Sequence, residues 1–354
     1  MGNHRVLLYF TLFFIIYMIW AQWQIEYGPK PAPAVVQEKT ADGVIKEAVP
    51  SADISAINGQ AAPAIVENAA PISDRIKIVT DVLDVEIDTK GGDIVRVVLR
   101  DYSVTADEPE ELLVLLTDEN VNYHVAQSGL VSKNKGTAPS HNAVYRSEQS
   151  VYRLAEGTDV IEVPLYWTNN DGVSVKKVLT FRRNDYVVDV NYTVTAGSQN
   201  WTGSDYMQIT RSRPVEVNSN AFIRTYTGGV VYNEEIKYEK YDFDDIAEKN
   251  LNYQLTDGWL AMIQHYFLAA WLPETGKDNL YFSRYNSSKD HFTLGTRTSA
   301  ITIDAGQTGQ ITSRFVVGPK LQNKLEEIAP GLDLTVDYGI LTIFAKPLYL
   351  SLIH

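Results

Sequence analysis

The chain has 354 residues, of which 45% are hydrophobic and 21% are charged, so it can form one large or two ordinary folded domains. The net charge of −13 and the lack of clustered lysine and arginine argue against a phosphate-binding surface, and we expect no nucleic-acid partner. The absence of cysteine excludes disulfides, thiolate metal sites and a cysteine nucleophile.

The N-terminal sequence predicts a transmembrane helix. Residues 6–23 (VLLYFTLFFIIYMIWAQW) carry no charge, and as a helix they would be about 27 Å long, close to the thickness of a bilayer core. Trp20 and Trp23 lie where an aromatic belt is expected, and Arg5 precedes the apolar run, which favours a cytoplasmic location for residues 1–5. A cleaved signal peptide is the alternative, but bulky residues occupy the place of a cleavage site. We therefore predict an uncleaved anchor.

The next part of the chain changes composition. Residues 24–71 are rich in alanine and proline and contain few large apolar side chains. Such a sequence buries too little apolar surface to offset the entropy lost on ordering. We predict a disordered tether that connects the anchor to a folded domain.

Residues 72–318 show the period-two alternation of β-strands. Val82–Asp88 and Ile94–Leu99 predict a hairpin with Gly91 and Gly92 in its turn, and Val160–Trp167 and Val173–Phe181 predict a second one. Further strands are predicted at Tyr186–Thr195, Ile223–Tyr232, Leu280–Tyr285, His291–Thr296, Ile301–Asp304 and Ile311–Val317. The predicted fold class is all-β with minor α, a large antiparallel β-sandwich in a single domain.

The stretch Gly258–Pro273 (GWLAMIQHYFLAAWLP) has no charged residue and must be buried. We interpret it as a core strand with a bulge near Gln264 and His265, in which the histidine is a buried, hydrogen-bonded structural group. The alternative is the floor of an active site. His265 would then be a general acid, with an acidic partner such as Asp205 or Glu216.

No other motif indicates chemistry. The six histidines have no paired metal-ligand spacing, and the GxSxG, P-loop and GxGxxG patterns are absent. Asp242-x-Asp244-Asp245 lacks the glycine and glutamate of a calcium-binding loop, so we interpret it as a solvated acidic loop. We predict no catalytic residue, no metal and no cofactor.

The C-terminal part predicts a short helix at Lys320–Ala329, with Leu321, Leu325 and Ile328 on one face. It belongs to a helix-and-linker region, 319–336. Residues 337–354 are mostly apolar and predict an interfacial amphipathic segment that Pro347 breaks or restarts. We expect the natural protein to continue beyond this segment.

Three stretches together resemble the YidC family of bacterial membrane protein insertases. The first is the anchor with its tether, the second is Gly258–Pro273, and the third runs from Val317 to His354. The matching residues of the second stretch are Gly258, Trp259, Gln264, His265, Tyr266, Phe267, Trp271 and Pro273. Those at the junction to the membrane core are Gly318, Pro319, Lys320, Leu325, Asp337, Tyr338, Gly339 and Pro347. Ile340 departs from the pattern, because the family usually has tryptophan there.

The resemblance implies a periplasmic β-supersandwich, similar to sugar mutarotases, with a C-terminal helix. It also implies a protein of the bacterial inner membrane that assists insertion and folding of inner-membrane proteins without a cofactor or covalent chemistry. The implied partners are the lipid bilayer, nascent inner-membrane proteins, and the Sec translocon with its accessory subunits. The family's working groove is formed by later transmembrane helices, so no groove residue can be assigned in this chain.

Two other functions compete with this interpretation. A membrane-anchored carbohydrate-binding or carbohydrate-active β-sandwich would share the predicted fold class. A plain scaffold of the cell envelope is the third hypothesis.

Overall fold

The computed structural model describes Tyr17 and residues 74–105, 108–214 and 226–336. The chain separates into two compact units, 1–44 and 45–354. Tyr17 is helical, but the rest of the predicted anchor, the tether and the interfacial segment 337–354 lie outside the described residues. Within the described ranges, no helix has the length and apolar character needed to cross a membrane.

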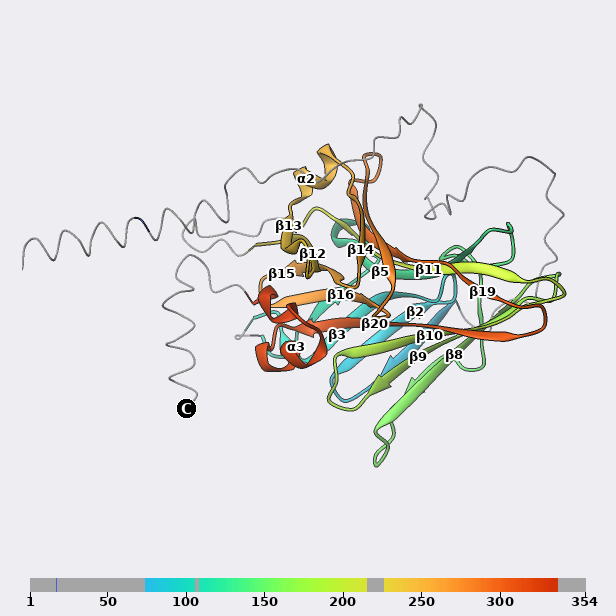
Figure 1. Cartoon of the computed structure of the whole chain (residues 1–354). Coiled ribbons are helices and arrows are strands. Elements are labelled where there is room, and N and C mark those ends of the chain that lie inside the picture. The colour runs from blue at the N-terminus through green and yellow to red at the C-terminus, as the bar shows by residue number, and fades with distance from the viewer. Residues whose placement is uncertain (1–16, 18–73, 106–107, 215–225, 337–354) are drawn as a thin grey trace, which may run out of the picture. The chain divides into compact units, whose positions relative to one another are not determined.

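Two large β-sheets form the described part of the second unit (Figure 1). In the first sheet the order is β14 (Asn252–Thr256), β17 (Asp278–Asn286), β18 (His291–Thr298), β11 (Trp201–Ser212), β5 (His124–Ser132), β3 (Asp93–Ser103), β2 (Leu83–Asp88), β1 (Arg75–Val79) and β7 (Val151–Arg153). In this sheet β19 (Ile301–Ile303) also pairs with β11, and β4 (Leu112–Leu116) with β3.

The second sheet has the order β13 (Lys237–Tyr241), β12 (Gly228–Asn233), β15 (Trp259–Gln264), β16 (Phe267–Pro273), β20 (Thr308–Pro319), β10 (Val187–Thr195), β9 (Ser174–Arg182), β8 (Val160–Thr168) and β6 (Arg146–Ser147). The helical elements are η1 (Asn120–Asn122), α2 (Phe243–Glu248), α3 (Gln322–Ile328) and η2 (Leu332–Thr335).

The predicted fold class is confirmed. Both predicted hairpins form, as the β2–β3 and β8–β9 pairs, and every strand pair except the parallel β1–β7 is antiparallel. Gly91 and Gly92 have φ angles of 79° and 62°, a conformation that glycine adopts without steric cost.

The main core lies between the two sheets, where the alternating side chains of each strand meet. In β10, for example, Val188, Val190, Tyr192 and Val194 are all buried in this core, whereas the residues between them are partly exposed. The period-two pattern in the sequence therefore reports which face of each strand is inside.

A buried polar cluster ties the sheets together. Lys177 on β9 is fully buried and its Nζ donates to the carbonyl oxygens of Gly91 (3.0 Å) and Gly92 (2.8 Å) in the first sheet's β2–β3 turn. Asp93 accepts a bond of 3.0 Å from the side chain of Gln127. Burial raises the pKa of Asp93 to about 7 and lowers the pKa of Lys177 to about 8, and the attraction between the two charges opposes both shifts.

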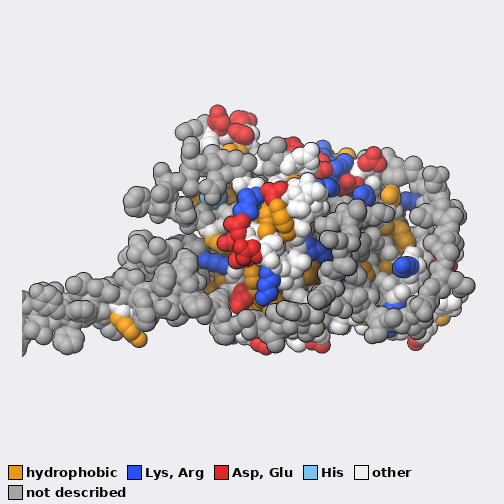
Figure 2. Space-filling model, turned by 90° about the horizontal axis from the view of Figure 1, so that it is seen from above, with side chains coloured by type: hydrophobic (Ala, Val, Ile, Leu, Met, Phe, Trp, Pro, Cys, Tyr) orange, Lys and Arg blue, Asp and Glu red, His pale blue; other side chains and the backbone are white. Residues whose placement is uncertain are grey.

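The prediction of a solvated acidic loop at Asp242–Asp245 is wrong. The stretch is not a loop, because Asp242 caps the helix α2: its side chain accepts from the Asp245 N–H, and the Asp245 carboxylate accepts from the Asp242 N–H. The acidic residues thus stabilise a helix N-terminus. Figure 2 shows acidic and basic side chains interspersed over the described part of one face. One acidic residue of α2, Asp244, forms an exposed ion pair with Arg213.

Asp205 gives a testable pH dependence. It is buried in β11, it accepts a hydrogen bond from the Thr298 hydroxyl, and burial raises its pKa from 3.8 to about 6. Between these pH values the unfolded chain has lost the proton while the native protein keeps it, so the native state loses stability as the pH rises. We expect Asp205→Asn to gain about 3 kcal/mol relative to the wild type between about pH 4 and pH 7.5.

Urea unfolding of the purified chain at a series of pH values measures this gain. Glu162→Gln, on the exposed edge of β8, is the matched control and should show no comparable change. A stability difference between Asp205→Asn and wild type that stays constant over the same pH range would contradict the prediction.

Candidate functional site

The uncharged stretch Gly258–Pro273 is a hairpin, which corrects the interpretation of one bulged strand. β15 and β16 pair from Leu260 opposite Trp271 to Gln264 opposite Phe267, and His265 and Tyr266 form a two-residue turn. Both strands read as continuous apolar runs because both faces of the hairpin are buried.

The two faces of the hairpin belong to different apolar cores. Leu260, Met262 and Trp271 pack into the main core between the sheets. On the outer face, Trp259, Ala261, Ile263, Leu268, Ala270 and Leu272 belong to a second core. The second core also contains Leu325, Ala329 and Leu332 of the C-terminal segment, residues 320–336. The C-terminal segment therefore covers the outer face of the second sheet at the β15–β16 hairpin.

His265 is not a buried core histidine. It is exposed at the hairpin turn with a φ of 39°, a region that non-glycine residues seldom occupy. It also does not meet Asp205, one of its two suggested acidic partners. Arg211 contacts Gln264 beside His265, whereas Asp205 lies six residues back along β11, roughly 20 Å away. Glu216, the other suggested partner, lies outside the described residues.

Gln264 joins the hairpin to the first sheet. Its side-chain oxygen accepts a bond of 3.0 Å from Nη2 of Arg211, which is buried in β11. Burial lowers the pKa of Arg211 to about 10. The Arg211 guanidinium also lies over the ring of Phe243, with 5.7 Å between Cζ and the ring centroid. Since the sequence gives no local signal for such a long-range contact, Arg211 was not predicted.

Lys320 fastens the start of the C-terminal segment to the hairpin turn. Its backbone N–H donates to the Tyr266 carbonyl at 2.8 Å, and its Nζ donates to the His265 carbonyl at 2.7 Å. The preceding Gly318 and Pro319 end β20, where Pro319 lies opposite Phe267. The turn of the β15–β16 hairpin thus fixes the position of Lys320, where the chain leaves the second sheet.

Helix α3 is shorter than predicted, because Lys320 and Leu321 precede its first turn and Ala329 follows its last. Of the three residues predicted on its apolar face, Leu325 is buried, Ile328 is partly buried and Leu321 is 40% exposed. One fully buried leucine is a small anchor for a helix of this length, so polar contacts at its ends matter.

The carbonyl groups at the C-terminal end of α3 have specific donors. Nε1 of Trp259 donates to the Pro330 carbonyl at 2.9 Å, and Nη2 of Arg314 donates to the Ile328 carbonyl at 3.1 Å. These bonds satisfy acceptors that a helix end leaves open. Gly331 then reverses the chain with a φ of 72°, and a side chain there would collide with the ring of Tyr232.

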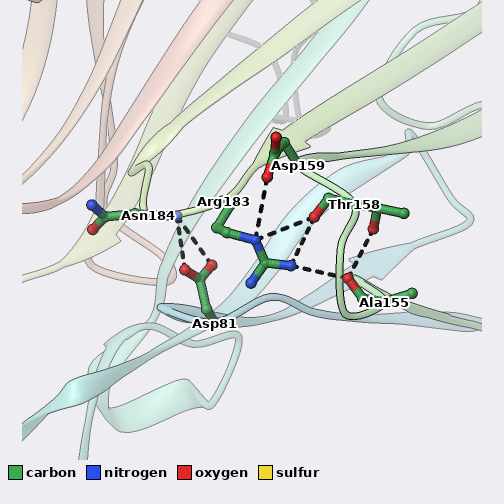
Figure 3. Close-up of polar contacts among 6 residues, drawn as sticks. All are labelled: Asp81, Ala155, Thr158, Asp159, Arg183 and Asn184. Carbon is green, nitrogen blue, oxygen red and sulfur yellow. Dashed lines mark hydrogen bonds and ion pairs between the residues drawn. The ribbon is translucent and has the colours of Figure 1, made fainter.

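Helix α3 also contacts the turn between β9 and β10. Nζ of Lys324 donates to the Asn184 carbonyl at 3.3 Å. Figure 3 shows how this turn is held: the Asp81 carboxylate accepts from the Asn184 N–H at 2.9 and 3.1 Å. In the same view, Arg183 donates to the carbonyl oxygens of Ala155 (2.9 Å) and Thr158 (2.7 Å).

The remaining predicted junction residues, Asp337, Tyr338, Gly339 and Pro347, lie outside the described residues. In the described ranges no group of three or more histidine and acidic side chains is placed to hold a metal ion. A cavity of about 400 Å³ lies near Glu274, Lys277, Thr298 and Asp304, remote from the hairpin turn. The arrangement around the hairpin is one of packing and carbonyl capping, which suits fixing an orientation.

The comparisons with known proteins identify the family. The model of the YidC periplasmic domain matches residues 75–351. The chain belongs to the YidC family.

Relatives named "Membrane protein insertase YidC" match nearly the whole chain. The proteins of Methylococcus capsulatus and Thioalkalivibrio sulfidiphilus are 40% and 42% identical to it, over 99% of the chain in each case. The match covers 63% and 64% of those two relatives, so this YidC chain spans just under two thirds of their length.

Solved structures similar to the chain include a galactose mutarotase related enzyme from Lactobacillus acidophilus. It is 11% identical with a TM-score of 0.45, and the match covers 69% of this chain and 97% of that one. A galactose mutarotase-like protein from Lactobacillus casei is 10% identical with a TM-score of 0.44, covering 69% and 100%.

Shortening Leu325 tests the docking of α3 in this YidC domain. We expect Leu325→Ala to destabilise the docked state of α3 by about 2–5 kcal/mol, because the substitution removes the buried leucine of the helix and leaves a cavity. Hydrogen exchange of the α3 amides should then become faster. Exposed Glu326→Ala is the matched control, and equal exchange rates in the two variants would contradict the docking role.

The substitution His265→Asn tests whether His265 is an exposed turn residue or a structural histidine of the core. Since asparagine tolerates positive φ better than histidine, we expect stability to stay the same or rise by up to about 1 kcal/mol. Denaturant unfolding measures the change, and Leu268→Ala in the adjacent buried strand should cost about 2–5 kcal/mol in the same assay. A loss of several kcal/mol in His265→Asn would restore the interpretation of a structural histidine.

Proposed function

We propose that the chain is the anchor and periplasmic part of a YidC insertase, which assists insertion and folding of inner-membrane proteins. The observation that carries this proposal is the match to the YidC periplasmic domain together with 40–42% identity to named insertases over nearly the whole chain. The relatives are longer, and the part of their length that the match does not cover leaves room for a membrane core.

The proposed topology places residues 1–5 in the cytoplasm, an anchor at 6–23, a tether at 24–71 and the β-sandwich of 72–318 in the periplasm. The uncharged N-terminal run and its aromatic end support the anchor. The proposed partners are the lipid bilayer, nascent inner-membrane proteins, and the Sec translocon with its accessory subunits.

The proposed activity needs no covalent chemistry and no cofactor. The carbohydrate alternative rests on the fold class, and its suggested acid–base pair was His265 with Asp205 or Glu216. His265 is exposed in a turn, and Asp205 is far along another strand. This geometry disfavours the pairing of His265 with Asp205.

Within the insertase, we assign the C-terminal segment a mechanical role. It is the last described part of the chain and is held by Leu325, Lys320, Lys324 and the donors Trp259 and Arg314. Val336, which packs against the second core, therefore has a fixed place on the β-sandwich. A fixed start would orient the periplasmic domain over the membrane core that follows in the relatives.

Complementation tests this role. In the full-length protein, Leu325→Asp should impair growth after depletion of the native insertase, because a buried carboxylate prevents docking of α3. Asp244→Asn, on the exposed face of α2, is the control and should complement normally. Protease protection of newly made inner-membrane proteins reports insertion directly.

Two outcomes would contradict the proposal at different levels. Equal complementation by both variants would remove the mechanical role of the C-terminal segment. Normal insertion of membrane proteins after depletion of the full-length protein would overturn the insertase function and favour a plain envelope scaffold.

A further inference from the structure

Exposed apolar side chains gather at the end of the sandwich where α3 begins. Tyr266 at the tip of the β15–β16 hairpin is 74% exposed, Val104 just after β3 is 51% exposed, and Leu321 before α3 is 40% exposed. Single exposed apolar residues are ordinary on protein surfaces, but a group of them needs an explanation.

The contacts between neighbouring residues place these side chains together. The Lys320 N–H bonds the Tyr266 carbonyl at 2.8 Å, so Leu321 follows directly beside the hairpin tip. The ring of Tyr102, two residues before Val104, lies edge-on against the ring of Phe267, with 5.5 Å between centroids. Tyr266 and Leu321 therefore border one surface, and the end of β3 that leads to Val104 lies beside it. We name this surface, with Val104, the apolar end; Figure 1 shows α3 and β16 at this end of the sandwich.

The apolar end has mixed charge. Lys320 and Lys324 lie on its α3 side, whereas Asp101 and Glu111 flank the β3–β4 connection near Val104. The chain as a whole carries a net charge of −13. Because acidic and basic side chains both lie beside the apolar end, we expect association here to depend on apolar contact more than on charge.

We propose that the apolar end is a membrane-docking surface, whose side chains enter the headgroup region of the bilayer; this rests on the proposed function. Tyrosine suits that region because its ring is apolar and its hydroxyl is polar. The occupant follows from the course of the chain, because the docked C-terminal segment leads at residue 337 into a mostly apolar sequence. A bilayer that receives this sequence lies on the side of the domain that carries α3.

This chain has no cysteine, so single cysteines can serve as labelling sites once any cysteine elsewhere in the full-length protein is replaced by serine. Single substitutions Tyr266→Cys, Leu321→Cys and Asn170→Cys each accept one environment-sensitive dye in the full-length protein, which is reconstituted in phosphatidylcholine–phosphatidylethanolamine vesicles. Asn170 is the matched control because it is exposed in the β8–β9 turn, at the opposite end of β9 from Asn184, roughly 30 Å away.

We expect dyes at 266 and 321 to show blue-shifted emission, quenching by headgroup nitroxide lipids and protection from aqueous iodide. The dye at 170 should show none of these. Raising the salt concentration should leave the quenching at 266 unchanged, because the contact is apolar. In a Tyr266→Ser/Leu321→Ser background, a dye at Val104→Cys should lose its lipid quenching while near-ultraviolet circular dichroism stays that of the folded domain.

Two results would overturn the docking surface. If iodide reaches position 266 as readily as position 170, the apolar end faces water. If position 266 is shielded from iodide but not quenched by the lipid nitroxides, a protein surface such as a second copy covers it. Insertion activity in the complementation assay is scored separately, so loss of lipid contact with normal insertion refutes only the docking surface.

Discussion

A hairpin with two apolar faces is the constraint on which the rest of this domain depends. β15 and β16 place large side chains on both sides of the second sheet, and neither side can be left in water without a cost of about 25 cal/mol for each Å² exposed. The first sheet covers the inner side. The outer side has to be covered by something else, and the chain supplies residues 320–336 for this purpose.

Residues 320–336 also bury backbone carbonyl groups, and several neighbouring side chains serve as hydrogen-bond donors to these groups. A short helix leaves carbonyl groups open at its end, and burying them unpaired would be costly. Trp259 and Arg314 donate to those of Pro330 and Ile328. Trp259 thus contributes an apolar ring to the second core and an N–H to the helix end, a combination that phenylalanine or leucine could not supply.

Much of the fold could be predicted from local pattern, because a strand with one wet face alternates and a glycine pair marks its turn. The hairpins at β2–β3 and β8–β9 are of this kind. In Gly258–Pro273 this pattern is missing, since both faces of the hairpin are buried, and a single strand was predicted where the structure has two. The turn of this hairpin is also made by His265 and Tyr266, which are not turn-forming residues.

Long-range contacts could not be predicted at all. The bonds from Arg211 to Gln264 and from Lys324 to Asn184 join residues 53 and 140 positions apart. The prediction for Asp242–Asp245 was wrong for a different reason. The spacing of a capping box was present in the sequence, but the helix that follows is too short to show a recognisable periodicity.

The docking of the C-terminal segment is also what makes it helical. Seven residues are too few to form a stable helix alone, so α3 exists because its side chains and carbonyl groups find partners on the sheet. Undocking and loss of helix are therefore one event, in which the hold of Leu325, the Trp259 bond and the Lys320 bonds are lost together. We therefore expect the segment to be either docked or released, with no helix in the released form. Such an element keeps the orientation of the chain that it joins to the β-sandwich for as long as it stays docked.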